Sequence, residues 1–148
     1  MPPSAVVDAS VLVSAFLFPE SVPGLILKLA GQGLFVLHLS PILIEETRRS
    51  LLNARLRETY GRSEEAVLSW CTRLQEIGAV LDTPLPDIGP AGRDPDDDHV
   101  IAAAIAAKAG IIVTGDKDLL ALGHYQAIRI LTARVFLTEL ALDKNGGS

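Results

Sequence analysis

Short apolar segments alternate with longer segments of helical periodicity along the chain, and this alternation limits the possible folds most strongly. The segments with the length and composition of buried strands are 4–8 (SAVVD), 34–39, 79–82, 111–114 and 128–131. Helix start signals lie between them, as in Ser40-Pro41 and Ser63-Glu64. Strands separated by helices pair in parallel, and a parallel sheet needs helices on both faces. The sequence therefore predicts an α/β fold of three layers, α/β/α, with a five-stranded parallel sheet.

The length of 148 residues is that of one domain with one core. Residues 1–142 are predicted to form this domain, and residues 143–148 to form a flexible C-terminal tail. No apolar segment reaches the roughly 20 residues that a membrane span needs, and the first residues lack the features of a secretory signal. Cys71 is the single cysteine, which excludes an internal disulfide framework and a cysteine zinc cluster. We therefore expect a cytoplasmic protein without a membrane partner.

The charges are segregated along the chain. The net charge of −5 argues mildly against a protein that simply coats nucleic acid. Four aspartates fall between positions 94 and 98, and five arginines fall between positions 48 and 62. The arginine-rich segment is interpreted either as a solvated face or as a surface for RNA phosphates or an acidic partner.

Four carboxylates from distant parts of the chain are expected to meet at one edge of the sheet. Asp8 ends the first strand, and Asp116 follows the fourth strand by two residues. Glu46 and Asp98 lie near the N-termini of predicted helices, and helical spacing places both in line with core-facing residues. Ligands of parallel sheets bind beyond the carboxyl ends of the strands. Hard oxygen ligands in this number suit Mg²⁺ or Mn²⁺ rather than zinc.

Several of these acids also have a purely structural interpretation. Asp8 fits a cap of the following helix, and Glu46 fits a solvated helix carboxylate. Glu45 fits an i,i+4 partner of Arg49. Asp118 fits a helix cap as well as it fits a metal ligand.

The other polar residues of the acidic stretch are assigned mainly to structure. Asp94 and Asp96 are interpreted as turn and cap residues around Pro95, while the role of Asp97 stays open. The histidines show no ligand spacing and are interpreted as structural or incidental; they are His38, His99 and His124.

Four short motifs occur in order along nearly the whole chain. They are Asp8-Ala9-Ser10, Glu46 with Leu51 after it, Asp98 ahead of 101–103 (IAA), and 113–118 (VTGDKD). In order and spacing, these motifs resemble those of the PIN-domain ribonucleases. The chain is most similar to the bacterial PIN proteins described as toxins of toxin–antitoxin pairs, the VapC group.

The resemblance implies a sheet order of 3-2-1-4-5, which places the first and fourth strands side by side. It also implies an endoribonuclease that hydrolyses RNA phosphodiester bonds with Mg²⁺ or Mn²⁺. The implied catalytic residues are Asp8, Glu46, Asp98 and Asp116, and the implied metal ligands are Asp8, Asp98, Asp116 and Asp118.

Two positions depart from the family pattern. Ser10 stands where the family often has Asn, which keeps a hydrogen-bonding side chain but changes its geometry. Thr47 stands where the family prefers a large apolar residue after the glutamate, which leaves the choice between Glu45 and Glu46 open.

The resemblance also implies partners, namely an RNA substrate, a small antitoxin protein and further copies of the chain in a homodimer or higher oligomer. The expected contacts to RNA are Ser10, Arg48, Arg49 and Lys117. A phosphoreceiver domain is disfavoured because no lysine ends the fifth strand, and a haloacid-dehalogenase-type phosphatase is disfavoured because Ser10 replaces its second aspartate. A PIN-like module that binds RNA, metal or a partner without cutting stays as the alternative.

Overall fold

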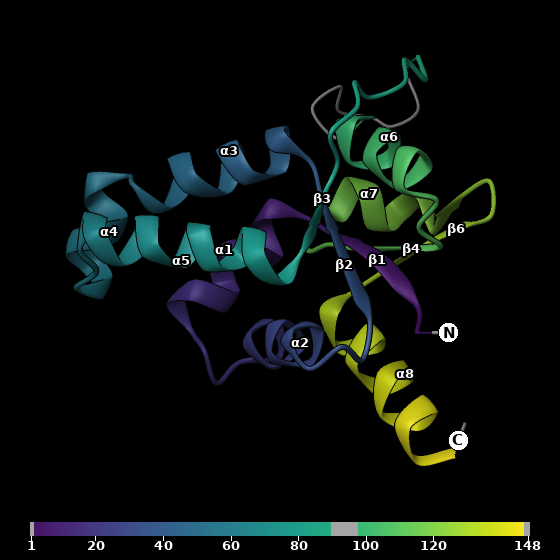
Figure 1. The fold of residues 1–148 in the computed structure, drawn as a ribbon, viewed down its shortest axis with the longest axis horizontal. Coiled ribbons are helices and arrows are strands. Elements are labelled where there is room, and N and C mark those ends of the chain that lie inside the picture. Colours follow the sequence, from purple (N-terminus) through teal and green to yellow (C-terminus); the bar gives the residue numbers. More distant parts are fainter. Residues whose placement is uncertain (1, 90–97, 147–148) are drawn as a thin grey trace.

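The computed structural model describes residues 2–89 and 98–146, and side chains as far as residue 142. Its centre is a six-stranded sheet in the order β3-β2-β1-β4-β6-β5 (Figure 1). The strands are β1 (Ser4–Val7), β2 (Val36–Leu39), β3 (Ala79–Val80), β4 (Ile111–Val113), β5 (His124–Tyr125) and β6 (Ile128–Leu131). All neighbours pair in parallel except β5, which runs antiparallel to β6 at the edge.

The fold class and strand order predicted from the sequence are confirmed. The fifth predicted strand corresponds to β6, so the predicted order 3-2-1-4-5 is observed as β3-β2-β1-β4-β6. The short strand β5 is an addition that the sequence did not indicate. The order places β1 next to β4, with Val7 opposite Val113. The residues that follow these two strands, Asp8 and Thr114, therefore emerge side by side.

Helices cover both faces of the sheet. They are α1 (Ala9–Leu17), α2 (Val22–Gly31), α3 (Pro41–Leu51), α4 (Ala54–Tyr60), α5 (Glu64–Ile77), α6 (Asp98–Ala107), α7 (Lys117–Leu122) and α8 (Ala133–Gly146). α1, α2 and α8 pack on one face of the sheet, and α6 and α7 pack on the other. Figure 1 shows α3, α4 and α5 extending to one side, beyond the sheet.

Alternate residues of the strands divide the core into two layers. Val7, Leu37 and Val113 face the layer that contains α1 and α2, whereas Val6 and Ile112 face α6. This alternation follows from the two-residue side-chain period of a strand. A third apolar cluster joins α1, α3 and α5 around Phe16, Leu51, Val67 and Cys71 and anchors the helical extension to the rest of the fold.

Serine caps set several helix starts where the sequence predicted them. The Ser40 hydroxyl accepts the Leu43 N–H at 3.1 Å at the start of α3, and the Ser63 hydroxyl accepts the Ala66 N–H at 3.1 Å at the start of α5. Such caps satisfy backbone donors that have no partner inside the helix. α8 continues to Gly146, four residues beyond the predicted end of the domain at residue 142. The acids Asp94, Asp96 and Asp97 lie outside the described residues.

Within the described residues, no single helix is long and apolar enough to cross a membrane. The bent pair α1 and α2, which meet at 97°, reaches the length and apolar composition of a broken span. Apolar residues of both helices, among them Leu12 and Ile26, are buried in the core of this fold.

Candidate metal centre

Asp8 lies at the junction between β1 and α1. Its backbone N–H donates to Val113 O at 2.9 Å, which extends the pairing of β1 with β4 by one residue. Its side chain caps α1, because Oδ1 accepts the Ala9 N–H at 2.7 Å. The residue is only 8% exposed. Asp8 is therefore held by both the sheet and the helix, and its carboxylate has a fixed orientation.

Thr114 connects Asp8 to the next acid. Its hydroxyl donates to Asp8 Oδ2 at 2.7 Å and accepts the Asp116 N–H at 3.0 Å. Thr114 itself is buried. The hydroxyl donates its one hydrogen to Asp8, and one of its lone pairs accepts the hydrogen of the Asp116 N–H. The two aspartates that the sequence placed at neighbouring strand ends are thus joined through one side chain.

Asp116 caps α7. Its Oδ1 accepts N–H groups from Asp118 at 2.8 Å and from Leu119 at 3.1 Å. Asp118 was one candidate for the cap of this helix, but the structure gives that role to Asp116, and Asp118 lies in the first turn. Within the described part of the chain, Asp116 Oδ2 receives no hydrogen bond, so one oxygen of this carboxylate is available to a ligand.

The two neighbouring glutamates of α3 point to different partners. Glu45 accepts two hydrogen bonds from Arg48, at 2.8 and 3.0 Å, and lies 3.7 Å from Arg49. The hydrogen bond from Arg48 is the main reason why the pKa of Glu45 is lowered. Glu46 instead contacts His99 of α6 through Oε1 and Nε2. The geometry therefore favours Glu46 over Glu45 at the candidate site.

The sequence placed Glu46 on the core-facing stripe of α3, and this detail is wrong. The buried residues of the helix are Leu43, Thr47 and Leu51. Thr47 is fully buried because its hydroxyl is satisfied by Leu43 O at 2.7 Å. Glu46 flanks the stripe, with 44% of its side chain exposed. A helix residue beside the buried stripe remains accessible to a ligand at the edge of the core.

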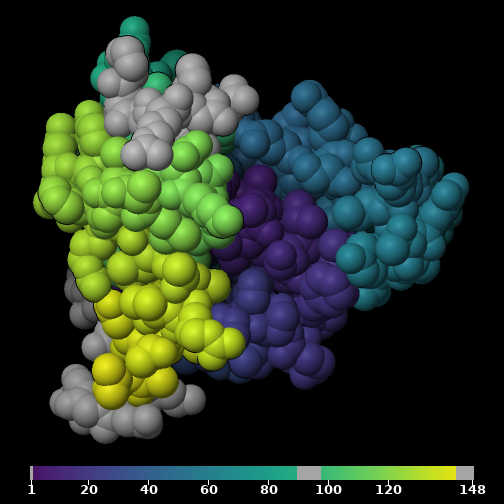
Figure 2. All heavy atoms as spheres, turned by 180° about the vertical axis from the view of Figure 1, so that it is seen from behind, coloured from purple at the N-terminus to yellow at the C-terminus, as the bar shows by residue number. Residues whose placement is uncertain are grey.

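The elements that carry the candidate acids lie next to one another. Figure 2 shows the purple N-terminal part of the chain between the green part that carries α7 and the blue helix α3. Asp98 is the first described residue of α6, next to His99. Asp98 lines a cavity of about 280 Å³ together with Ile42, His99, Ala102 and the segment 85–89.

The donor chemistry fits Mg²⁺ or Mn²⁺. Among the residues that the structure describes, no three acidic, histidine or cysteine side chains converge closely enough to hold a cation as they stand. A three-ligand protein cage is not required, since Mg²⁺ usually keeps several waters and binds one or two carboxylates. Asp8 and Asp116, tied together through Thr114, provide two carboxylates in fixed positions.

The residues expected to contact RNA differ in their exposure and in the partners that they already have. Lys117 is exposed at the start of α7, and 79% of the Arg49 side chain is exposed. The Arg48 guanidinium is engaged by Glu45. The Ser10 hydroxyl accepts the Gly115 N–H at 3.3 Å, so Ser10 joins α1 to the β4–α7 loop.

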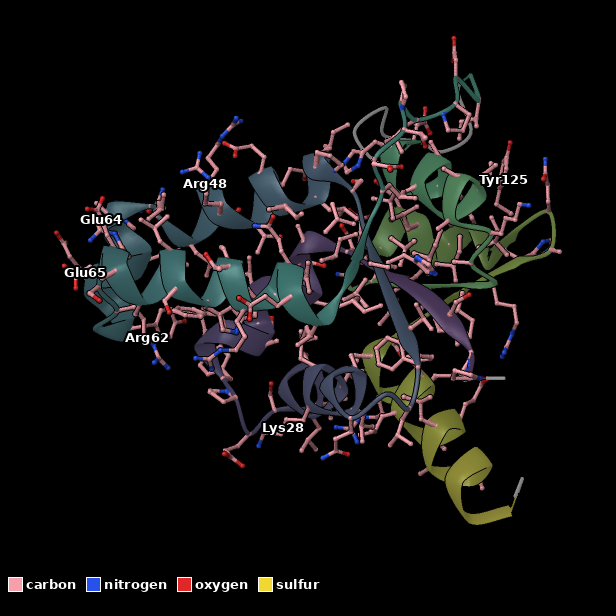
Figure 3. All side chains as sticks on the ribbon, in the orientation of Figure 1. Lys28, Arg48, Arg62, Glu64, Glu65 and Tyr125 are labelled. Carbon is pink, nitrogen blue, oxygen red and sulfur yellow. The ribbon has the colours of Figure 1, made fainter. Side chains whose placement is uncertain are left out.

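The arginine-rich segment is dispersed in space rather than gathered into one patch. Figure 3 shows Arg48 and Arg62 on opposite sides of α5. Arg62 donates to Leu17 O at 3.1 Å and lies over the Phe16 ring, 5.3 Å from its centroid. Arg62 therefore supports the helical extension instead of facing the candidate acids.

The structure gives two residues contacts that the sequence did not indicate. Thr114 was noted only as part of a motif, and its position between Asp8 and Asp116 depends on the β1–β4 register. His99 was interpreted as structural or incidental. The available signal for His99 was its place beside Asp98 at the start of a helix, but its partner Glu46 lies on another helix.

Comparison with known proteins identifies the family of this chain. The family model described as PIN domain matches residues 4–118. The chain is also 34% identical over 117 residues to the uncharacterized protein MJ1680 of Methanocaldococcus jannaschii, a match that covers 79% of this chain and 73% of the relative. The match of the family model includes β1, α3, α6 and β4, the elements next to or carrying the candidate acids. The chain therefore belongs to the PIN-domain family, whose members are typically nucleases.

Proposed function

We propose that this protein is an endoribonuclease that hydrolyses RNA phosphodiester bonds with Mg²⁺ or Mn²⁺. The observation that carries the proposal is the hydrogen-bonded connection Asp8–Thr114–Asp116 at the ends of two adjacent parallel strands. It occurs in a chain of a family whose members are typically nucleases. A connection of this kind holds two carboxylates ready for a divalent cation, and without a cation the same acids would repel RNA phosphates.

Each candidate residue has a defined part in this proposal. Asp8 and Asp116 hold the cation directly or through water, and Asp98 and Asp118 complete its surroundings. Glu46 orients a water or a further ligand from α3. When bound, the cation supplies charge neutralisation at the scissile phosphate and lowers the pKa of a coordinated water. No side-chain nucleophile is needed.

Contacts with the RNA backbone are assigned to residues around these acids. Lys117 and Arg49 are exposed and attract phosphates. Arg48 is a weaker choice because Glu45 already engages its guanidinium. Ser10 contributes by holding the loop at Gly115 in place next to the start of α1.

The direct test is cleavage of a fluorescent RNA by the wild type and by Asp8→Asn and Asp98→Asn, each with Mg²⁺, Mn²⁺ or EDTA. The Asn side chain at position 8 keeps an oxygen that can cap α1, but its amide NH2 replaces the oxygen that accepts the Thr114 hydroxyl, so thermal unfolding of Asp8→Asn is measured beside its cleavage rate. We expect both variants to lose more than roughly 100-fold in rate, the upper end of the loss caused by removing a partner of a metal ligand. A circular RNA substrate tests for endonucleolytic cleavage.

The matched control is Glu64→Gln, which removes an exposed carboxylate from the remote N-terminus of α5 (Figure 3). It should cleave RNA like the wild type. Full activity of Asp8→Asn and Asp98→Asn, or undiminished cleavage in EDTA, would contradict the proposal. Metal binding by the wild type without cleavage of RNA would favour the alternative, a non-catalytic PIN-like module that binds metal, RNA or a protein.

Within this proposal, we infer that the protein acts in the cytoplasm as the toxin of a toxin–antitoxin pair, as a homodimer or higher oligomer. The support is the resemblance of its motifs to toxin-type PIN proteins. Induced expression in a bacterial host should stop growth for the wild type and not for Asp8→Asn. Co-expression with the product of an adjacent short gene should restore growth, and unchanged growth with the wild type would contradict the toxin role.

A further inference from the structure

The contact between His99 and Glu46 joins two helices that are far apart in the sequence. His99 is the second described residue of α6, and Glu46 lies in the middle of α3. His99 Nε2 contacts Glu46 Oε1. A carboxylate only accepts hydrogen bonds, so the histidine nitrogen is the donor. The contact therefore defines the direction in which the Glu46 side chain points.

The histidine is the more firmly held member of this pair. Its side chain is 16% exposed, whereas that of Glu46 is 44% exposed. The ring is bordered by Ile42 of α3 and by Asp98 and Ala102 of α6, which line the same cavity. A long and half-exposed glutamate loses rotamer freedom when it is held in one orientation. The His99 ring, which is less exposed than Glu46 and contacts its carboxylate, supplies this restraint.

Glu46 has no other polar contact within the described part of the chain. Its neighbour Glu45 is held by Arg48, and Thr47 is satisfied inside the helix. Glu46 also keeps a second oxygen, Oε2, that His99 does not contact. The Glu46 carboxylate is thus oriented by His99 through one oxygen, and its other oxygen stays available to a further ligand.

We propose that His99 is a positioning residue that holds the Glu46 carboxylate in the orientation in which it serves the proposed cation, so that cation affinity in this chain depends on a histidine that is not itself a ligand. The inference rests on the proposed function, because Glu46 must serve the metal centre. His99 touches neither the substrate nor the reacting atoms in this scheme. It acts through Glu46 alone.

The test compares two amide variants of the full chain. In His99→Gln the side-chain amide reaches the position of Nε2, whereas in His99→Asn it is too short to reach Glu46. Mn²⁺ binding is read from the rise in unfolding temperature with Mn²⁺ concentration, since a ligand that binds the folded state stabilises it. We expect His99→Asn to raise the Mn²⁺ dissociation constant by about 10-fold, and His99→Gln to stay close to the wild type.

A double-mutant cycle separates positioning from general support of the fold. In the Glu46→Gln background, His99→Asn should cause no further loss of Mn²⁺ affinity. The matched control is His124→Asn, which changes an exposed histidine of the edge strand β5 and should leave Mn²⁺ binding unchanged. At saturating Mn²⁺, His99→Asn should recover most of the wild-type kcat, because the lost affinity is compensated by concentration.

The outcomes distinguish this inference from the proposed function. If the wild type binds Mn²⁺ and cleaves RNA while His99→Asn binds Mn²⁺ equally well, the positioning role is wrong and the function stands. Equal losses in the wild-type and Glu46→Gln backgrounds would also overturn it, because His99 would then act independently of Glu46. A wild type that neither binds Mn²⁺ nor cleaves RNA overturns the proposed function and this inference together.

Discussion

The Thr114 hydroxyl lies 2.7 Å from Asp8 Oδ2 and joins the carboxyl ends of β1 and β4. The same hydroxyl accepts the Asp116 N–H at 3.0 Å. One buried side chain thus joins two acids that follow different strands. The parallel pairing of Val7 with Val113 sets the distance between the two strand ends, and the Thr114 hydroxyl holds the segment that leads from β4 to Asp116.

We expect Thr114→Val to impair the site and Thr114→Ser to preserve it. Valine has nearly the same shape but leaves Asp8 Oδ2 without a donor and Asp116 N–H without an acceptor. RNA cleavage should fall by roughly 10–100-fold, and the free energy of unfolding by about 1–3 kcal/mol. Steady-state cleavage and urea unfolding measure the two effects. Thr138→Val on α8, where the hydroxyl bonds to Arg134 O at 3.0 Å, is the control and should leave cleavage unchanged. Wild-type activity of Thr114→Val would show that the bridge is dispensable.

The adjacent glutamates of α3 should differ in their effect on catalysis. Glu46→Gln removes the charge of the carboxylate that faces α6 and should strongly reduce cleavage at subsaturating Mg²⁺. Glu45→Gln breaks an exposed interaction with Arg48 and Arg49, which contributes little to stability, and should cleave at close to the wild-type rate. Initial rates across a Mg²⁺ titration compare the two variants. If Glu45→Gln cleaves RNA more slowly than Glu46→Gln, the catalytic glutamate is Glu45 and not Glu46.

Gly24 and Gly31 of α2 should respond in opposite directions to alanine. A Cβ at Gly24 would lie 2.1 Å from Pro19 O, a backbone atom that moves only with the preceding turn. Gly24→Ala should therefore lower the free energy of unfolding by about 1–3 kcal/mol through overpacking. Gly31 has no atom within 4 Å of the added Cβ, and Gly31→Ala should raise stability by up to about 1 kcal/mol through helix propensity. Thermal unfolding of both variants tests this, and equal melting temperatures would contradict the predicted clash.

Acid should destabilise the protein in part through His38. Burial lowers the pKa of His38 in the folded state below its ordinary value of 6.5. Between the two pKa values the unfolded chain binds more protons than the folded one, so stability falls as the pH decreases below 6.5. His38→Gln removes this contribution. Between pH 7.5 and pH 5.5, the unfolding midpoint of the wild type should therefore fall more than that of His38→Gln. An equal fall in both proteins would exclude the effect.

The parts of the fold that local chemistry encodes were predictable from sequence. Ser40 and Ser63 cap helices where expected, and the continuous burial of β1 from Ala5 to Val7 follows from its apolar run. α4 was missed because it has no buried residue and hence no apolar periodicity, although Asn53 and Gly61 mark its two ends. β5 was missed because two residues paired antiparallel across a tight turn leave no pattern of their own.

In the candidate site too, the residues placed by local sequence were predictable, and those placed by tertiary packing were not. Asp8 and Asp116 were predictable because each follows an apolar strand, and the parallel order brings the strand ends together. The phase of α3 was harder, because Thr47 takes a core position by bonding to its own helix, and this displaces Glu46 to the flank. The His99–Glu46 contact depends on how α3 packs beside α6. No spacing within either helix carries that information.

The bond between Thr114 and Asp8 spans 106 positions of the chain, and this separation orders events during synthesis. A nascent chain that has emerged as far as α5 already carries Asp8 and Glu46 but lacks Thr114, His99 and Asp116. Contacts between such distant positions form late in folding. Asp8 and Asp116 are therefore joined only when β4 inserts beside β1, and the growing polypeptide cannot assemble the proposed cation site until Asp116, in the last third of its length, has left the ribosome.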